Sequence, residues 1–294
     1  MAGKTAAGAS MPVILDGRAF AARIRDDLRR ELESLKSTPM LAICSFKTPA
    51  SELYRKAQTL QARAIGIRCP EMFEFSFRTD APAAMIEGVI QEWNNDPRIH
   101  GIFVHQPVPP QIDAQRISSL IDPRKDVEGI HPQNSARRFF ARARIGSCTA
   151  LAVMELIEAT GQDLTGKEAV VVGHSEIVGR PVSMLLLDKQ ATVTICHVAT
   201  SLAGKLEEHV RRADVLVVAV GKPHFVKGDW IKSGAIVIDV GINVVGGRVV
   251  GDVEFEAAKS RAGYITPVPG GVGPLTVMMV MKNTVEAFKL QQPA

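Results

Sequence analysis

Residues Val170-Val171-Val172-Gly173-His174-Ser175-Glu176-Ile177-Val178-Gly179-Arg180-Pro181 decide how the second half of this chain folds. The run starts with consecutive valines, turns at Gly173 and continues into a helix-forming stretch after Gly179. Glycines at such a turn let the backbone approach a pyrophosphate, and the helix that follows offers its first N–H groups. The spacing is G-x-S-x-x-x-G rather than G-x-G-x-x-G, so the motif alone fits a plain strand–helix turn equally well.

The end of the next predicted strand bears on the choice of cofactor. A carboxylate there holds the ribose 2′-hydroxyl of NAD, whereas an arginine suits the 2′-phosphate of NADP. The strand Thr192–Cys196 is followed instead by His197 and Val198, so neither group is present. His174 and His197 could add positive charge near a phosphate, and each is also compatible with an ordinary surface histidine. The residues themselves leave NAD and NADP open.

Short apolar runs alternate with amphipathic stretches along the whole chain. Continuous Val/Ile/Leu runs are typical of strands covered on both faces, and they predict strands at Leu41–Ser45, Met72–Phe77, Ile99–Val104, Ala169–Val172, Thr192–Cys196, Val215–Val220 and Ala235–Val240. The stretches between them predict helices at Arg18–Leu35, at Ser51–Ile65 with Ser51 as its cap, at Pro82–Trp93, and at Thr276–Leu290 after the Gly/Pro-rich loop Pro267–Pro274. This alternation predicts an α/β protein with mostly parallel sheets.

Composition narrows the class of protein further. A chain of 294 residues suggests about two domains, and its apolar runs are much shorter than the roughly 20 residues of a membrane helix. The net charge of +4 is spread without blocks, which argues against a nucleic-acid partner. The four cysteines lie far apart, so we expect neither a metal site nor a disulfide framework. We expect residues 1–10 to be a flexible tail on a cytoplasmic protein.

Several strings, taken together, are specific to one family. They are Val171–Pro181, Ile238–Asn243, Gly251-Asp252-Val253 and the loop Thr266–Pro274, which contains Pro-Gly-Gly-Val-Gly-Pro. With these strings the chain resembles the bifunctional methylenetetrahydrofolate dehydrogenase/methenyltetrahydrofolate cyclohydrolase family over nearly its whole length. The resemblance implies a folate-binding catalytic domain of residues 11–150 plus 275–294 and a Rossmann-like, doubly wound cofactor domain of residues 151–274, with a cleft between them. It also implies a homodimer and NADP as the default cofactor, with NAD not excluded.

The resemblance carries over to individual positions. For the folate substrate it implies Tyr54, Pro107, Glu128, Pro269, Gly270 and Gly271. For the cofactor it implies Thr149, Gly173, His174, Ser175, Ile177, Val178, Gly179, His197, Gly221, Ile242 and Thr276. The catalytic set is Tyr54, Gln58, His105 and Glu128.

Part of this set departs from the family pattern. The family's Y-x-x-x-K helix places Gln58 where the lysine stands, because Tyr54 takes the tyrosine position. Lys56 is about 200° around the helix from Tyr54, so we interpret it as a solvated lysine. His105 stands where the family has Gln, and Glu128 where it has Asp. The segment Ser147–Ala152 lacks both prolines and the glycine of the family's P-C-T-P-x-G.

These departures affect the two reactions of the family differently. Hydride loss from the methylene carbon depends mainly on positioning, because the flanking nitrogens stabilise the cation. Hydrolysis needs a positioned acid/base group, typically worth about 10²–10⁴-fold, and Gln58 has no proton to exchange. We therefore predict a dehydrogenase with weak or absent cyclohydrolase activity. The alternatives are a fully bifunctional enzyme in which His105 or water replaces the lysine, a non-catalytic folate- or nucleotide-binding paralogue, and an oxidoreductase for a different one-carbon carrier.

Overall fold

A computed structural model describes residues 11–35, 37–140 and 143–292 of the chain. The tail predicted at residues 1–10 lies outside the described residues. The chain divides into two compact units. We call residues 19–151 with 275–294 the three-stranded unit, and residues 1–18 with 152–274 the six-stranded unit, after their main sheets. No described helix is long and apolar enough to cross a membrane.

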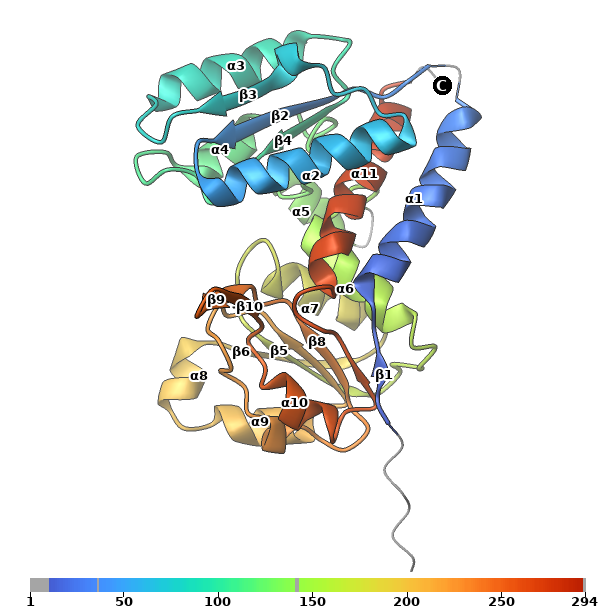
Figure 1. The fold of residues 1–294 in the computed structure, drawn as a ribbon, viewed down its shortest axis with the longest axis vertical. Helices are drawn as coiled ribbons and strands as arrows, with labels where there is room; N and C mark the ends of the chain where they lie inside the picture. The colour runs from blue at the N-terminus through green and yellow to red at the C-terminus, as the bar shows by residue number, and fades with distance from the viewer. Residues whose placement is uncertain (1–10, 36, 141–142, 293–294) are drawn as a thin grey trace, which may run out of the picture. The chain divides into compact units, whose positions relative to one another are not determined.

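The three-stranded unit is built on a parallel sheet in the order β3-β2-β4. Its strands are β2 (Leu41–Phe46), β3 (Glu74–Phe77) and β4 (Gly101–Val104). Its helices are α2 (Pro49–Ile65), η1 (Glu71–Phe73), α3 (Ala83–Asn95), α4 (Ala114–Leu120) and α5 (Pro132–Phe139). Figure 1 shows the sheet between α2 and α3. Alternate residues of β2, such as Ala42 and Cys44, pack with Ile86 and Ile90 of α3 in one apolar core.

Helix α2 carries two of the four residues that the sequence assigns to catalysis, Tyr54 and Gln58. It starts one turn earlier than predicted, because the Thr48 hydroxyl accepts the N–H of Ser51 and Pro49 occupies the first turn. The helix ends at Gly66, whose φ of 96° is left-handed and whose N–H reaches the carbonyls of Ala62 and Arg63. The predicted cap Ser51 therefore lies inside the helix, where its hydroxyl is available for another role.

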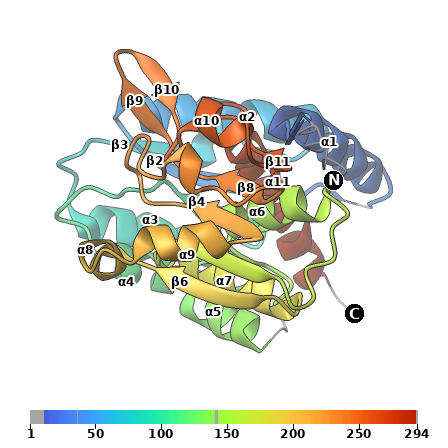
Figure 2. The ribbon, with the colours of Figure 1, turned by 90° about the horizontal axis from the view of Figure 1, so that it is seen from below.

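The six-stranded unit contains a sheet in the order β1-β11-β8-β7-β5-β6, in which all pairs are parallel. The strands of this sheet are β1 (Val13–Ile14), β5 (Glu168–Val172), β6 (Thr192–Cys196), β7 (Val215–Val218), β8 (Ile236–Asp239) and β11 (Tyr264–Ile265). Two further strands, β9 (Asn243–Val245) and β10 (Arg248–Val250), form a separate antiparallel hairpin. Its helices are α7 (Gly179–Asp188), α8 (Val198–Leu202), α9 (Leu206–Arg212), η2 (Gly228–Trp230) and α10 (Phe255–Lys259). Figure 2 shows α9 beside β6. Val170 and Val172 of β5 pack with Leu206 and Val210 of α9 in the core of this unit.

Three further helices cross the boundaries between the units: α1 (Gly17–Glu33), α6 (Cys148–Glu158) and α11 (Val272–Leu290). Helix α11 begins inside the Gly/Pro-rich loop rather than after it, because a proline such as Pro274 is tolerated in a first helical turn. Residues 11–18, which the sequence analysis assigns to the folate-binding domain, pack with the other unit. They belong to the six-stranded unit, since β1 pairs with β11 through Val13–Tyr264 and Ile14–Ile265. The predicted strand at Met72–Phe77 is shorter than expected, because Met72 and Phe73 form the short helix η1.

Candidate active site and nucleotide pocket

The turn between β5 and α7 is closely packed. Gly173 has a φ of 124°, and a Cβ on it would collide with the Ala219 carbonyl of β7's end. A Cβ on Gly179 would collide with the Gly173 carbonyl. The Ser175 hydroxyl accepts the N–H groups of Val178 at 3.2 Å and Gly179 at 3.4 Å. The two glycines therefore permit close packing of backbone against backbone at this turn, and Ser175 holds the first turn of α7. The approach to a pyrophosphate stays a prediction.

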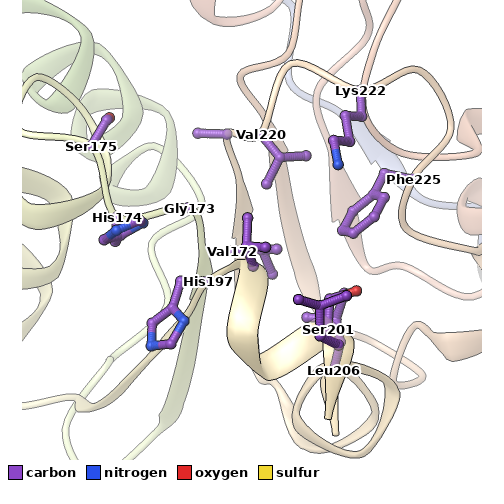
Figure 3. A pocket seen from close by; sticks show the side chains of 13 residues that line it. Val172, Gly173, His174, Ser175, His197, Ser201, Leu206, Val220, Lys222 and Phe225 are labelled. Carbon is purple, nitrogen blue, oxygen red and sulfur yellow. The ribbon is translucent and has the colours of Figure 1, made fainter. Parts of the chain in front are cut away.

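A cavity of about 310 Å³ opens beside this turn. Four residues predicted for the cofactor line it together: Gly173, His174, Ser175 and His197. The imidazoles of His174 and His197 lie 5.4 Å apart between ring centroids. Figure 3 shows these histidines on one side of the pocket and Lys222 with Phe225 on the other. Of the 13 lining residues none is Asp or Glu.

Sequence reasoning missed Lys222, although it is the one Lys or Arg in this lining. Its ammonium lies 5.5 Å from the centre of the Phe225 ring. Its position could have been found from the topology, because β7 is the neighbour of β5 in a parallel sheet, and ligands bind beyond the carboxyl ends of such strands.

The loop that carries Lys222 is held by a buried carboxylate. Asp252 is fully buried and accepts the N–H groups of Val220 at 2.7 Å, Gly221 at 2.9 Å and Lys222 at 2.8 Å, and the Asn243 amide at 2.9 Å. The predicted residue Gly221 is thus a loop residue between two lining residues, with a left-handed φ of 64°.

The other residues predicted for the cofactor lie elsewhere. Ile177, Val178 and Gly179 do not line the cavity. Ile242 lines a second cavity of about 150 Å³ in the six-stranded unit, together with Pro269, Gly270 and Gly271, which were predicted for the folate. Thr149 and Thr276 lie on α6 and α11 within the three-stranded unit.

Three of the four predicted catalytic residues, Tyr54, Gln58 and His105, meet between α2 and β4. His105 follows β4, is 2% exposed, and its Nε2 lies 2.8 Å from Oε1 of the fully buried Gln58. Its Nδ1 lies 3.0 Å from the Ser51 hydroxyl. The Tyr54 ring lies 5.3 Å from the imidazole, edge on. Phe103 of β4 completes this aromatic group at 5.4 Å from His105.

The charge state of His105 follows from its surroundings. Burial lowers the pKa of His105 to about 4, with a further lowering by Arg55 and an opposing effect of Glu52. The imidazole is therefore neutral at pH 7. Lys56, in contrast, is exposed and lies among surface residues of α2, which agrees with its interpretation as a solvated lysine.

Within the segment Lys125–Gly129, Glu128 is the candidate for a role in substrate binding or catalysis. Lys125 donates to the carbonyls of Trp93, Asn94 and Asp96, and Asp126 accepts the N–H groups of Gly129 and His131. Both are structural. Burial, with a smaller contribution from Asp126, raises the pKa of Glu128 to about 8. A carboxyl group of this kind is largely protonated at neutral pH.

Two further residues near this site have structural explanations. Pro107 lies two residues after His105, and the peptide bond between Gln106 and Pro107 is cis. Cys148 donates its thiol to the Val127 carbonyl at 3.2 Å, and burial raises its pKa well above the ordinary value. Because the thiolate is the nucleophilic form, Cys148 has no features of a nucleophile.

A cavity beside a glycine turn at the carboxyl ends of parallel strands is typical of nucleotide-binding α/β proteins. Comparison with known proteins gives the family. Residues 147–292 match the tetrahydrofolate dehydrogenase/cyclohydrolase NAD(P)-binding domain, and residues 15–128 match the catalytic domain of the same name. The chain belongs to the tetrahydrofolate dehydrogenase/cyclohydrolase family.

Relatives align over nearly the whole chain. The "Bifunctional protein FolD 2" of Geobacter sulfurreducens is 48% identical over 289 residues, which is 95% of this chain and 98% of the relative. The protein of the same name from Myxococcus xanthus is 47% identical over 280 residues, or 93% and 95% of the two chains. Among solved structures, a Trypanosoma brucei methylenetetrahydrofolate dehydrogenase-cyclohydrolase complexed with NADP and an inhibitor superimposes with a TM-score of 0.91 at 39% identity, covering 97% of this chain and 99% of that one.

Proposed function

We propose that this protein oxidises 5,10-methylenetetrahydrofolate to 5,10-methenyltetrahydrofolate with NADP, and that it hydrolyses the methenyl product slowly or not at all. The family match supports the dehydrogenase reaction. The observation that carries the second part is the hydrogen bond between Gln58 and His105. By the resemblance Gln58 stands where the family has lysine, and neither side chain of the pair titrates near pH 7.

The pocket of the six-stranded unit fits NADP. It lies beside the glycine turn at Gly173, its lining contains no carboxylate that would repel a phosphate, and Lys222, His174 and His197 are among its lining residues. NADP supplies the hydride acceptor when bound. The related Trypanosoma brucei structure contains NADP. We propose Gly173 and Ser175 for the pyrophosphate and the three basic residues for the 2′-phosphate.

Removal of the hydride requires little from the protein except that it orients the folate and the cofactor. The cation that forms is stabilised by the two nitrogens that flank the reacting carbon, so no protein base is required. Tyr54 offers an aromatic face for the folate, and Glu128 offers a carboxyl group for hydrogen bonds to the pterin edge. We propose Pro107, Pro269, Gly270 and Gly271 as further folate contacts.

Hydrolysis asks for a group that accepts a proton from water. His105 is poorly suited, because both its ring nitrogens are engaged, one with Ser51 and one with Gln58. Its pKa of about 4 also makes it a weak base at pH 7. The fully bifunctional alternative would require this pair to separate or a water to act unaided.

An absorbance assay with 5,10-methylenetetrahydrofolate and each nicotinamide cofactor tests the proposal by resolving methenyl from formyl product. Accumulation of methenyl product is expected. Rapid formation of formyl product would instead establish the bifunctional reading, and an absence of turnover with folate bound would favour a binding paralogue. The double variant Gln58→Lys with His105→Gln rebuilds the family's pair and is expected to raise hydrolysis by roughly 100-fold.

We propose also that the protein is a homodimer. Strand β6 is an edge of the six-stranded sheet, and Ile195 on it and Leu187 on the adjacent α7 are 40% and 52% exposed. An exposed apolar edge strand is a ready surface for pairing with a second copy. Light scattering of Ile195→Lys, expected to be monomeric where the parent is dimeric, tests this surface.

A further inference from the structure

The buried carboxamide of Gln58 is only half satisfied. Its Oε1 pairs with His105, whereas its Nε2 has no hydrogen-bond partner among the described residues, although the side chain is fully buried. A buried amide nitrogen without a partner is unfavourable in a folded protein and is rare unless a ligand or water satisfies it. The two protons on this nitrogen therefore point to an acceptor that the protein itself does not supply.

The orientation of this amide is consistent with a chain of hydrogen bonds that runs through His105 to Ser51. A carboxamide oxygen only accepts, so Nε2 of His105 must carry the proton of the 2.8 Å bond to Gln58. A neutral imidazole has one N–H, and Nδ1 must then accept the hydroxyl proton of Ser51 across 3.0 Å. The Ser51 oxygen is also an acceptor, for the N–H of Phe46 at 3.1 Å. Every proton between the end of β2 and the carboxamide is thus assigned.

The surroundings keep this chain in one state. Tyr54 and Phe103 contact the imidazole edge-on from α2 and β4. The nearest charges are Arg55 and Glu52 on α2, which pair with each other at 3.0 Å, while Arg55 also binds Glu74 and Glu52 also binds Ser76. These charges pair with one another, and the effect of Glu52 on the pKa of His105, which favours the imidazolium, is smaller than the effects of burial and of Arg55, which oppose it. A neutral Nε2–H tautomer follows from the contacts alone.

We propose that Nε2 of Gln58 is a fixed, uncharged hydrogen-bond donor to an acceptor lone pair of the bound folate, and that Ser51 is a positioning residue that sets its orientation through His105. This inference rests on the proposed function, because it takes a folate as the ligand of the site. The donor serves binding without changing charge, whereas a lysine at this place would bind and also exchange protons. Ser51 acts two hydrogen bonds away from the ligand and does not touch it.

The matched variants are Gln58→Glu, Ser51→Ala and Ser51→Thr, with Lys56→Gln as the control on the exposed side of α2. Gln58→Glu keeps an oxygen for His105 but replaces the donor by a second acceptor. Calorimetric titration with tetrahydrofolate, without turnover, is expected to show binding weakened about ten-fold or more in Gln58→Glu. Ser51→Ala is expected to weaken binding about three-fold, through the lost orientation, with Ser51→Thr restoring it and Lys56→Gln unchanged. In the dehydrogenase assay, Gln58→Glu and Ser51→Ala are both expected to raise KM for the folate and to leave kcat unchanged.

A second readout follows the orientation directly. Nitrogen NMR of His105, identified by comparison with His105→Gln, is expected to show a protonated Nε2 and an unprotonated Nδ1 in the parent protein, and a mixture of the two neutral tautomers in Ser51→Ala. An unfolding free energy in urea close to that of the parent shows that the three-stranded unit of each variant is folded. A parent protein with the proton on Nδ1, or equal folate binding by Gln58→Glu, overturns this inference alone. If the parent protein binds no folate, the proposed function fails, and this inference fails with it.

Discussion

The imidazole of His105 and the carboxamide of Gln58 form a buried hydrogen bond of 2.8 Å that joins the end of β4 to the middle of α2. Two uncharged groups therefore occupy the centre of the catalytic region in the three-stranded unit. Since His105 is 2% exposed, protonation would place a positive charge in a site that is built for a neutral ring. The pair links the stability of this unit to pH.

We predict that His105 makes the protein sensitive to acid. Its pKa is about 4 in the fold, against an ordinary value of 6.5. The unfolded chain therefore binds the proton more readily, and the unfolding free energy falls as pH drops below 6.5 until about pH 4. The difference corresponds to on the order of 3 kcal/mol. Urea unfolding of the parent and His105→Gln at pH 7 and pH 4.5 should show a smaller loss in the variant.

Other groups contribute to the acid response, so the comparison needs a matched protein. Lys56→Gln changes an exposed residue of the same helix and is expected to follow the parent at both pH values. If His105→Gln loses as much stability between pH 7 and pH 4.5 as these two proteins, His105 is not the group responsible.

Lys222 is predicted to distinguish NADP from NAD. It is the only Lys or Arg lining the nucleotide pocket, so its ammonium is available to an added phosphate. Lys222→Met should raise the dissociation constant for NADP by about ten-fold and change that for NAD little. Because Lys222 is exposed, the difference should shrink at high salt. Equilibrium titrations with both nucleotides measure it, and Lys205→Met, outside the lining, serves as the control. Equal effects on the binding of the two nucleotides would show that Lys222 does not bind the 2′-phosphate of NADP.

Glu128 is predicted to give the dehydrogenase reaction an alkaline pH dependence. With a pKa of about 8, the carboxyl group is mostly neutral at pH 7 and ionised at pH 9. The ionised form accepts hydrogen bonds from the pterin edge better, so KM for the folate should fall as pH rises through about 8. Glu128→Gln removes the titration and should leave KM flat over this range, roughly ten-fold above the parent at pH 9. A parent profile as flat as that of Glu128→Gln would exclude this role.

The sequence predicted the layered α/β fold because its strands are continuous apolar runs whose neighbours are amphipathic. It failed at element ends, where single hydrogen bonds decide. Thr48 rather than Ser51 caps α2, and α11 begins at Val272 inside a loop rich in glycine and proline. No local pattern encodes the pairing of β1 with β11, which joins residues 11–18 to the six-stranded unit, because the paired segments are about 250 residues apart.

The candidate site was predicted unevenly for a similar reason. The resemblance placed Tyr54, Gln58 and His105 in one site, and the structure brings them into contact. No pattern indicated that Ser51 would orient His105, because its hydroxyl was interpreted as a helix cap. Lys222 was missed since its neighbours in the pocket come from β5 and β6, and only the strand order brings these three segments together.

Asp252 is predicted to hold the Lys222 loop in its binding shape. Its two oxygens accept three consecutive backbone N–H groups and the Asn243 amide, which an asparagine at this position cannot do, because one of its two terminal atoms is a donor. Asp252→Asn should lower the unfolding free energy by about 2 kcal/mol, since at least one buried N–H loses its acceptor. It should also weaken NADP binding by several-fold, because the loop that carries Lys222 is released. Urea unfolding and nucleotide titration measure the two effects separately, and Asp229→Asn, an exposed residue of the same unit, provides the comparison. Loss of stability with unaltered NADP affinity would show that the carboxylate supports the fold without shaping the pocket.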